Sequence, residues 1–421
     1  MGLRRMRALL DQLGSPDRRL RIIHIAGSKG KGSTAAFAAA IGQAAGYRVG
    51  LSTSPHLHSY RERIAIHGSP VTHAQFARFA AAVHDETDQL ERSRPELGQV
   101  TAFEILTAMA LLAFEQESCD LAVVEVGLGG TFDATNVVDP VVSVITRLDL
   151  EHTQVLGDSI ESIAANKAGI IKRHTPVVTA AQEAAALAVI RATAEQRHAP
   201  LQIAVVDFAW EGSWRDFAWR GASLELTQLH AGLAGAHQME NASLAIAAWG
   251  VLRKAGFDLE ESAIRMGVEA THLPGRFERV EREGHTWVLD GAHTPVAAAA
   301  LADELLAEFG QPVTGIVALL RDKQADQFVQ ALAPAISELI VTTTANPRSI
   351  PADELAHIAS TVLSQTIPSP GIDTAFQRIR AASPGPEVVV ITGSLSLVAE
   401  ARTRLGLANP DDDSPNPGIC G

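Results

Sequence analysis

A glycine-rich turn between a predicted strand and a predicted helix constrains this chain more than any other segment. Residues 21–26 (RIIHIA) form a β-branched run, residues 27–32 (GSKGKG) form the turn, and a small-residue helix is expected over residues 33–45. Such a turn lets backbone N–H groups and the helix dipole converge on an anion, while a lysine reaches the outer phosphates. The lysine spacing departs from the strict phosphate-loop pattern, and glycines also form ordinary turns, but the combination predicts nucleotide binding.

The surrounding sequence alternates strands with helices. Strands are expected at residues 47–53, 121–126, 141–146 and 176–180, and helices at residues 102–116 and 238–255. The near-continuous apolar strands are typical of a parallel sheet that is covered on both faces, so the pattern predicts a doubly wound α/β fold. Residues 201–229, which contain three tryptophans, alternate polar and apolar side chains and are expected to form a small antiparallel insert.

A domain boundary is predicted near Leu273-Pro274-Gly275, because the strand–helix alternation restarts after it. The restarted pattern predicts a smaller Rossmann-like α/β domain. Its expected strands are residues 286–290, 313–319, 338–343 and 388–392, and its expected helices are residues 295–309, 325–336, 351–363 and 397–405. We therefore expect domains at residues 1–274 and 275–408, followed by a disordered tail at residues 409–421.

Composition narrows the class of protein. The net charge of −13 disfavours a general binder of nucleic acid or anionic membranes, although a local cationic pocket could still hold a small anion. The two cysteines, Cys119 and Cys420, form neither a disulfide framework nor a thiolate zinc site. There is no secretory signal and no uncharged apolar run long enough for a membrane helix, so we expect a cytoplasmic protein.

Polar residues close the predicted strands of the first domain, where ligands of such sheets bind. Glu125 ends an apolar strand and suits Mg²⁺, with an exposed strand-end carboxylate as the alternative. His152 follows the next strand and is expected to contact metal or phosphate, with a structural histidine as the alternative. Asp149 and Glu151 are expected either to join it or to be exposed loop charges. Lys167, judged from the residues alone, is expected to be a solvated surface lysine.

Two further strand ends stand out in the second domain. Asp290 and His293 lie in the segment LDGAHTP, which ends a predicted strand and opens a helix. They could bind ribose or substrate, or transfer a proton. Ser394, in the segment TGSLS, repeats this position later in the chain. For both segments, an ordinary turn with a helix cap is the equally weighted alternative.

Nine segments in order resemble the folylpolyglutamate synthase/dihydrofolate synthase family of the Mur ligase superfamily. The resemblance implies a P-loop-type Mur ligase ATPase domain with a mostly parallel sheet, a smaller Rossmann-like domain, and an active site between them. It also implies ATP-dependent ligation of L-glutamate to a pteroate or folate carboxylate through an acyl phosphate. The segments include HIAGSKGKGST (24–34), TSPHLHSYRERIAIHG (53–68), TAFEILTAMALLAF (101–114), EVGLGGTFDATN (125–136), EHTQVLGDSIESIAANKAGIIK (151–172), HQMENA (237–242), LPGRFE (273–278), LDGAHTP (289–295) and TGSLSLV (392–398).

The resemblance also implies roles for individual residues. For ATP it implies Gly30, Lys31, Gly32, Ser33, Asn241, Arg276 and Asp290; for two Mg²⁺ ions it implies Ser54, Glu125, His152 and Lys167, the last as a CO₂-derived carbamate. Lys31, Lys167 and His293 are the implied catalytic residues. The implied substrate contacts are Thr101, Phe103, Glu104 and Asp133 on the pterin side and Ser394 for glutamate.

Four positions depart from the family's usual residues: Lys29 replaces Asn, Thr131 replaces Arg, Glu151 replaces Asp and Thr294 replaces Asn. None removes an implied metal ligand, so ATP chemistry is expected to persist, while the identity of the acceptor is less constrained. The resemblance also implies a helical segment ahead of GLRRMRALL, so the chain is expected either to start late or to enclose the pterin pocket less fully.

The leading hypothesis is therefore a dihydrofolate synthase, a folylpolyglutamate synthase, or a bifunctional enzyme. The alternatives are a Mur-type ligase retuned to another carboxylate and a catalytically silent nucleotide-binding homologue. The expected partners are small molecules (ATP, L-glutamate and a folate or pteroate), with no nucleic acid and no membrane, and the expected state is a monomer.

Overall fold

The computed structural model describes residues 3–382 and 387–408 and divides the chain into two units. The N-terminal unit comprises residues 1–56, 60–232 and 236–272, and the C-terminal unit comprises residues 57–59, 233–235 and 273–421. The expected disordered tail and Cys420 lie outside the described residues. Cys119 is a partly buried free thiol.

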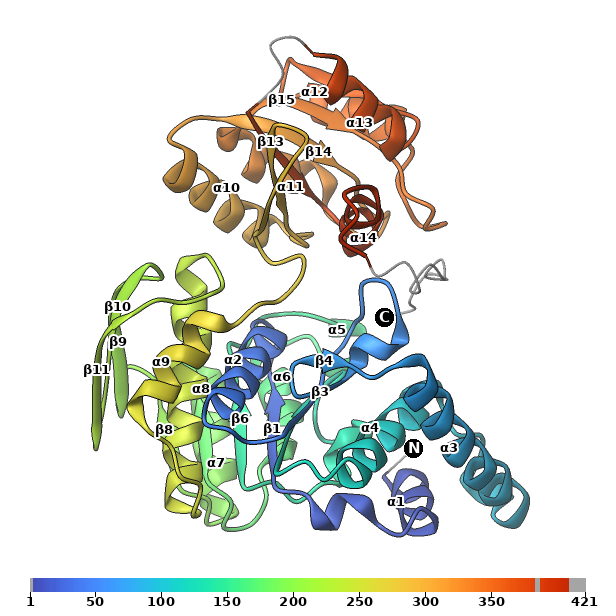
Figure 1. Cartoon of the computed structure of the whole chain (residues 1–421), viewed down its shortest axis with the longest axis vertical. Helices are drawn as coiled ribbons and strands as arrows, with labels where there is room; N and C mark the ends of the chain where they lie inside the picture. Colours follow the sequence, from blue (N-terminus) through green and yellow to red (C-terminus); the bar gives the residue numbers. More distant parts are fainter. Residues whose placement is uncertain (1–2, 383–386, 409–421) are drawn as a thin grey trace. The chain divides into compact units, whose positions relative to one another are not determined.

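The N-terminal unit is built on an eight-stranded sheet of order β4-β3-β2-β5-β1-β6-β7-β8 (Figure 1). All neighbours pair in parallel except β3, which is antiparallel to both β2 and β4. The mostly parallel α/β fold expected from the sequence is confirmed. The strands are β1 Ile22–Ala26, β2 Val49–Ser52, β3 Ile64–Ile66, β4 Ser69–Pro70, β5 Leu121–Glu125, β6 Val142–Ile145, β7 Val177–Thr179 and β8 Leu201–Ile203.

Helices cover this sheet on both faces, which explains why its central strands are entirely apolar apart from a few functional or hydrogen-bonded side chains. The helices α1, α3 and α4 share one apolar cluster with the sheet, and α2, α8 and α9 pack together on the other side (Figure 1). The helices are α1 Arg4–Gln12, α2 Lys31–Ala44, α3 His73–Ser93, α4 Ala102–Gln116, α5 Thr153–Leu156, α6 Ile160–Lys167, α7 Ala184–Gln196, α8 Ala236–Lys254 and α9 Glu261–Ala270, with short 3₁₀ helices η1 Pro16–Arg19, η2 Tyr60–Arg63, η3 Pro95–Leu97, η4 Ala134–Val137 and η5 Ala168–Ile170.

The predicted antiparallel insert is correct for only part of residues 201–229. A separate three-stranded antiparallel sheet contains β9 (Phe208–Ser213), β10 (Asp216–Gly221) and β11 (Leu224–Leu229). The first three residues of the stretch instead form β8, which extends the main sheet in parallel with β7. The alternation of polar and apolar side chains does not distinguish such a short parallel edge strand from the hairpin that follows it.

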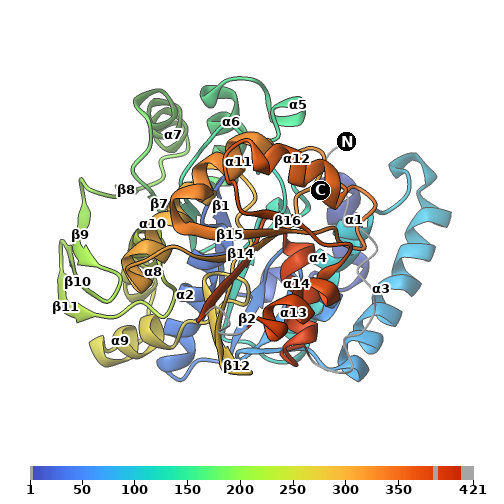
Figure 2. The same ribbon diagram turned by 90° about the horizontal axis from the view of Figure 1, so that it is seen from above.

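The C-terminal unit has a six-stranded sheet of order β12-β13-β17-β14-β15-β16, parallel except for the edge strand β12 (Figure 2). It has the Rossmann-like character expected from the sequence. The elements are β12 Glu278–Arg282, β13 His285–Leu289, α10 Pro295–Phe309, β14 Val313–Val317, α11 Ala325–Leu332, η6 Ala333–Ala335, β15 Ile336–Val341, α12 Ala352–Ser360, β16 Thr366–Pro368, α13 Ile372–Ala381, β17 Val388–Thr392 and α14 Leu395–Arg404. Among the described residues, no helix combines the length and apolarity needed to cross a bilayer.

The phosphate-loop helix α2 lies unusually close to α9. A Cβ added to Gly267 of α9 would lie 2.4 Å from the Cα of Ile41 in α2. Because that neighbour is backbone, it cannot rotate away as a side chain can. A glycine is therefore required at this crossing.

We predict that Gly267→Ala lowers the free energy of unfolding by about 2–3 kcal/mol, since the extra methyl forces two helix backbones apart. The matched control is Gly250→Ala in α8, where an added Cβ meets no atom within 4 Å. That change should stabilise by roughly 0.5–1 kcal/mol through the lower entropy of the unfolded chain. Urea unfolding of both variants measures the difference, and equal effects would contradict the close contact.

Candidate active site

The backbone of the glycine-rich turn is held in place from the loop that follows β6. The amides of Ser28 and Lys29 both donate to the carbonyl of Arg147, at 2.9 and 3.1 Å. The hydroxyl of Thr146 donates to the carbonyl of Lys29 at 2.6 Å. The turn is therefore fixed before any ligand binds, and it leads directly into α2 at Lys31.

Asn241 packs directly on this turn. Gly30 has a φ of +84°, which favours glycine, and a Cβ there would lie 2.2 Å from Oδ1 of Asn241. Asn241 is buried; its Nδ2 donates to Gln238 at 2.9 Å, and its Oδ1 accepts from Thr34. Of the residues expected to bind ATP, Gly30, Lys31, Gly32, Ser33 and Asn241 thus come together at the start of α2.

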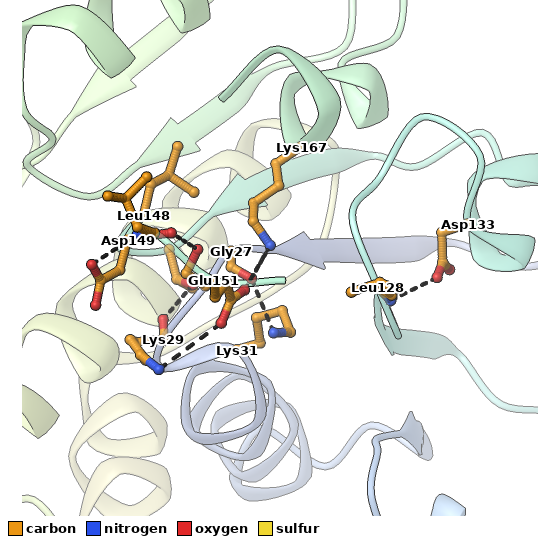
Figure 3. A network of polar contacts seen from close by, with 12 residues as sticks. Gly27, Lys29, Lys31, Leu128, Asp133, Leu148, Asp149, Glu151 and Lys167 are labelled. Atoms are coloured by element: carbon orange, nitrogen blue, oxygen red, sulfur yellow. Dashed lines mark hydrogen bonds and ion pairs between the residues drawn. The ribbon is translucent and has the colours of Figure 1, made fainter. Parts of the chain in front are cut away.

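Two lysines converge on one backbone carbonyl. The Nζ atoms of Lys31 and Lys167 donate to the carbonyl oxygen of Gly27 at 2.9 and 2.8 Å, from α2 and α6 respectively (Figure 3). Lys167 also donates to Oε1 of Glu151 at 3.0 Å, while Nζ of Lys29 lies 3.9 Å from the other oxygen of that carboxylate. Three cations and one carboxylate therefore surround the turn, which suits a polyanionic ligand.

Lys167 is not a surface residue, so the interpretation drawn from the residues alone is wrong. Only 1% of the residue is exposed. Burial lowers the pKa of Lys167 to about 8 from 10.5; the carboxylate of Glu151 opposes this shift, and the nearby charge of Lys31 adds to it. Short-range sequence patterns could not reveal this burial, because it depends on contacts with the distant Gly27 and with the loop after β6.

Glu125 ends β5 in a buried position, so the alternative of an exposed strand-end carboxylate is also wrong. Its Oε2 accepts from the amide of Ser54 at 2.9 Å. A Cβ added to Gly32 would lie 3.7 Å from the same oxygen, which puts the carboxylate beside the first turn of α2. A hard oxygen ligand therefore stands next to the predicted phosphate site, where it fits Mg²⁺.

Glu125 also lines a small pocket. Its lining includes Ser54, Arg63, Phe103 and Glu125. Nε of Arg63 donates to Nδ1 of His56 at 2.9 Å; burial lowers the pKa of this guanidinium, and the charge of Glu125 opposes the shift. An aromatic ring and a cation therefore lie beside the carboxylate of Glu125.

The remaining metal candidates are less closely gathered. His152 is exposed and precedes α5 with a φ of +48°. In the described ranges, no three His, Cys, Asp or Glu side chains are close enough to form a metal centre by themselves. As an ammonium, Lys167 cannot bind a cation, so its expected ligand role requires the carbamate.

Three expected pterin-side residues have structural contacts. Thr101 and Glu104 form the capping box of α4, and the carboxylate of Glu104 pairs with Arg5 at 2.7 Å. The carboxylate of Asp133 accepts from the amides of Leu128 and Thr135, each at 2.9 Å. Burial raises the pKa of Asp133, and these amides oppose the shift. Of the expected pterin-side set, Phe103 alone lines the pocket beside Glu125.

In the C-terminal unit, Asp290 organises the turn after β13. Its two carboxylate oxygens accept from the amides of Phe277 and Ala292, each at 2.8 Å. A Cβ on Gly291 would lie 2.5 Å from Nη1 of Arg276, so this arginine packs on the same turn. Nδ1 of His293 lies 2.8 Å from the carbonyl of Gly291.

Ser394 caps α14 through the amide of Leu397, as the helix-cap alternative describes. The adjacent Gly393 donates to the carbonyl of Ala292 at 2.9 Å. The turns after β13 and β17 are therefore joined, and Arg276, Asp290, His293 and Ser394 lie on neighbouring segments of this unit.

Comparison with known proteins agrees with both units. The Mur ligase middle domain matches residues 25–249, and the Mur ligase glutamate ligase domain matches residues 275–395. The dihydrofolate synthase/folylpolyglutamate synthase of Bacillus subtilis (strain 168) is 35% identical over 412 residues, covering 96% of this chain and 95% of the relative. The chain belongs to the folylpolyglutamate synthase/dihydrofolate synthase family of Mur ligases. The resemblance seen in the sequence is confirmed.

Solved structures of the family superpose on nearly the whole chain. Folylpolyglutamate synthase of Mycobacterium tuberculosis, complexed with ADP and AMPPCP, is 35% identical with a TM-score of 0.88, covering 97% of this chain and 96% of that one. E. coli FolC, in complex with DHPP and ADP, is 29% identical with a TM-score of 0.84, covering 96% and 93%.

The departures from the usual family residues have local explanations. The hydroxyl of Thr131 donates to the carbonyl of Asn166 at 2.8 Å, which ties the loop after β5 to α6. Thr294 caps α10 by accepting from the amide of Ala297. Lys29 and Glu151 contact each other, so two departures in the family's phosphate site form one ion pair.

The sequence analysis did not single out Arg63, and it left the role of Glu151 open. Arg63 lies within RERI, where charge alone does not distinguish it from Arg61, and only the fold turns it toward Glu125. Glu151 was expected either to join His152 or to be an exposed loop charge, and the structure instead pairs it with buried Lys167.

The pKa of Lys167 predicts a pH effect on stability. Between about pH 8 and 10.5 the unfolded chain binds more protons at Lys167 than the folded chain does. The free energy of unfolding of the wild type should therefore rise with pH in this window relative to Lys167→Met, by up to about 1.4 kcal/mol per pH unit.

The measurement is urea unfolding of both proteins in CO₂-free buffer. Below pH ~7 the lysine is protonated in both states, so the difference between the two proteins should stay constant there and serves as the control. A difference that also stays constant through the upper window would contradict the lowered pKa.

Proposed function

We propose that this chain is an ATP-dependent ligase that joins L-glutamate to the carboxylate of a pteroate or folate, as a dihydrofolate synthase, a folylpolyglutamate synthase or both. One arrangement supports the proposal: the carboxylate of Glu125 stands beside the first turn of α2, next to the turn that Lys31 and Lys167 contact, and it also lines the pocket that contains Arg63 and Phe103. A nucleotide phosphate and an aromatic carboxylate could meet there in a member of this family.

The reaction follows from the chemistry of a carboxylate, which is a poor acylating agent. Attack of the acceptor's carboxylate oxygen on the γ-phosphorus of ATP forms an acyl phosphate and releases ADP. The uncharged amine of L-glutamate then attacks the acyl carbon. The tetrahedral intermediate expels phosphate, loses a proton and leaves an amide.

Each residue of the N-terminal unit has a role in this proposal. Gly30, Gly32 and Ser33 would offer backbone donors to the phosphates, and Asn241 would contact ATP. Lys31 would exchange the Gly27 carbonyl for the outer phosphates. Thr101, Glu104 and Asp133 would support the pterin side, and Phe103 would line it.

The buried carboxylate of Glu125 is a hard oxygen ligand that suits magnesium. Ser54, Glu125 and His152 would hold one Mg²⁺, and the carbamate of Lys167 would contribute to a second site. Bound Mg²⁺ would offset the negative charge that gathers as the two anionic substrates meet. The chain's own cations, Lys29 and Lys31, would add to that effect.

In the C-terminal unit, we propose that Arg276 and Asp290 contact ATP and that His293 contacts substrate or the intermediate. Ser394 is the proposed glutamate contact. Asp290, His293 and Ser394 lie on two joined turns, and Arg276 packs against the first of them. The cytoplasmic location and the monomeric state expected from the sequence remain predictions.

The first experiment is glutamate-dependent ADP release with Mg²⁺ and ATP, run in parallel with dihydropteroate and tetrahydrofolate. We predict activity with at least one acceptor, and activity with both would indicate a bifunctional enzyme. Omission of glutamate is the control. ATP binding without ADP release on either acceptor would contradict the proposal and favour the retuned or silent homologue.

A second prediction concerns Lys167→Ala, which should lower kcat about 100-fold or more, because one group that stabilises charge is lost from a buried site. If Lys167 is carbamylated, its neutral amine adds to CO₂ and releases a proton. Bicarbonate should then reactivate CO₂-depleted wild type but not the variant. Labelling with ¹³C-bicarbonate and NMR would detect the carbamate directly, and wild-type activity in Lys167→Ala would refute this role.

A further inference from the structure

The central strand β1 contains one polar side chain, His24, whose position is unusual. The residue is fully buried between apolar neighbours Ile23 and Ile25, which are also fully buried. In the sheet it pairs with Val124 of β5 and Ser143 of β6. Burial is the main cause that lowers its pKa to about 3, with Lys172 contributing, so the ring is neutral at physiological pH.

His24 begins a chain of buried hydrogen bonds. Its Nε2 lies 2.9 Å from Oγ1 of Thr135, and that hydroxyl donates to Oδ1 of Asp133 at 2.5 Å. A hydroxyl has one proton to donate, and Thr135 donates it to Asp133. The hydroxyl oxygen must then accept from His24, which fixes the ring as the tautomer with the proton on Nε2.

The other ring nitrogen, Nδ1, lacks a hydrogen bond to any described residue, and this destabilises the fold. Within the part of the chain that the structure describes, Nδ1 of His24 is buried without a hydrogen-bond partner. A valine or isoleucine would fill this strand position without that penalty. The histidine is therefore explained by its Nε2–H, the one polar group that it uses.

Asp133 transmits this contact to the loop after β5. Its Oδ2 accepts from the amide of Leu128 at 2.9 Å, and a Cβ on Gly127 would lie 2.4 Å from Cζ of Phe103. The turn that Asp133 holds thus packs against the aromatic ring that lines the pocket beside Glu125. Displacement of the carboxylate would release the turn and this wall together.

We propose that His24 and Thr135 are positioning residues for the acceptor side of the active site. They hold the carboxylate of Asp133, and through it the turn at Gly127 and Leu128, in the orientation that the folate or pteroate requires. This inference rests on the proposed function. It assigns a role in acceptor binding to a side chain in the middle of the central strand.

The test compares Thr135→Val with Thr135→Ser. Valine keeps the volume but removes the hydroxyl, and serine keeps the hydroxyl. We expect Thr135→Val to raise KM for the acceptor about tenfold, with KM for ATP changed less than about twofold, which corresponds to the loss of one buried hydrogen-bonding group. Thr135→Ser should restore an acceptor KM near the wild-type value.

Ser143→Ala is the matched control for the loss of a buried hydroxyl. Ser143 is fully buried in the same sheet row as His24, and its hydroxyl donates to the carbonyl of Ile170 at 3.0 Å, away from Asp133. It should leave the acceptor KM unchanged even if it destabilises the fold. Equal changes in acceptor KM for Thr135→Val and Ser143→Ala would overturn the proposal.

A second pair of variants applies if Thr135→Val does not fold. His24→Gln keeps a side-chain N–H donor, and His24→Leu does not; equal acceptor KM values for these two would overturn the proposal. The activity of the wild type distinguishes a failure of the proposed function from a failure of the positioning role. Wild-type silence with every acceptor contradicts the proposed function, whereas an active wild type with an unchanged acceptor KM in Thr135→Val contradicts the positioning role alone.

Discussion

The carbonyl oxygen of Gly27 accepts hydrogen bonds from Lys31, four residues later in the chain, and from Lys167, 140 residues later. Several elements of the N-terminal unit must be in place for the two lysines to meet there. This arrangement requires that β1 ends beside β6, that α2 starts at the turn, and that α6 places Lys167 next to Gly27. The carboxylate of Glu151 makes the arrangement tolerable, because two ammonium groups on one carbonyl would otherwise repel each other in a region of reduced dielectric constant.

The sequence predicted the fold well where local patterns coincide with tertiary structure. The helix at residues 102–116, the helix at residues 295–309 and the strand at residues 388–392 match α4, α10 and β17 in their bounds. Long helices such as α3 were not singled out, although Thr72 and Gln75 form a capping box at its start. Its buried residues Phe79, Val83, Thr87 and Leu90 follow the spacing of one helical face, so this helix was predictable from the sequence.

The site was predictable where backbone geometry defines it and much less so where side chains from distant segments meet. The strand ends and the glycine-rich turn were predicted to face one ligand site, and the structure places Gly32 beside Glu125. The burial of Lys167 depends in part on Gly27, 140 residues earlier, and Arg63 meets Glu125 only in the folded chain; only the family resemblance had singled out Lys167. His24 was not predicted to have a role, because the segment that contains it, residues 21–26, resembles any buried strand.

The pinned backbone of the glycine-rich turn has a consequence for the thermodynamics of ligand binding. Its amides are already tied to Arg147, its carbonyl to Thr146, and the helix that follows is wedged against Gly267. A phosphate arriving there has no loop to order, so the conformational entropy lost on binding falls mainly on the side chains of Lys29 and Lys31. The conformational entropy of the turn is thus lost during folding, so each catalytic cycle begins with a binding site that is already rigid.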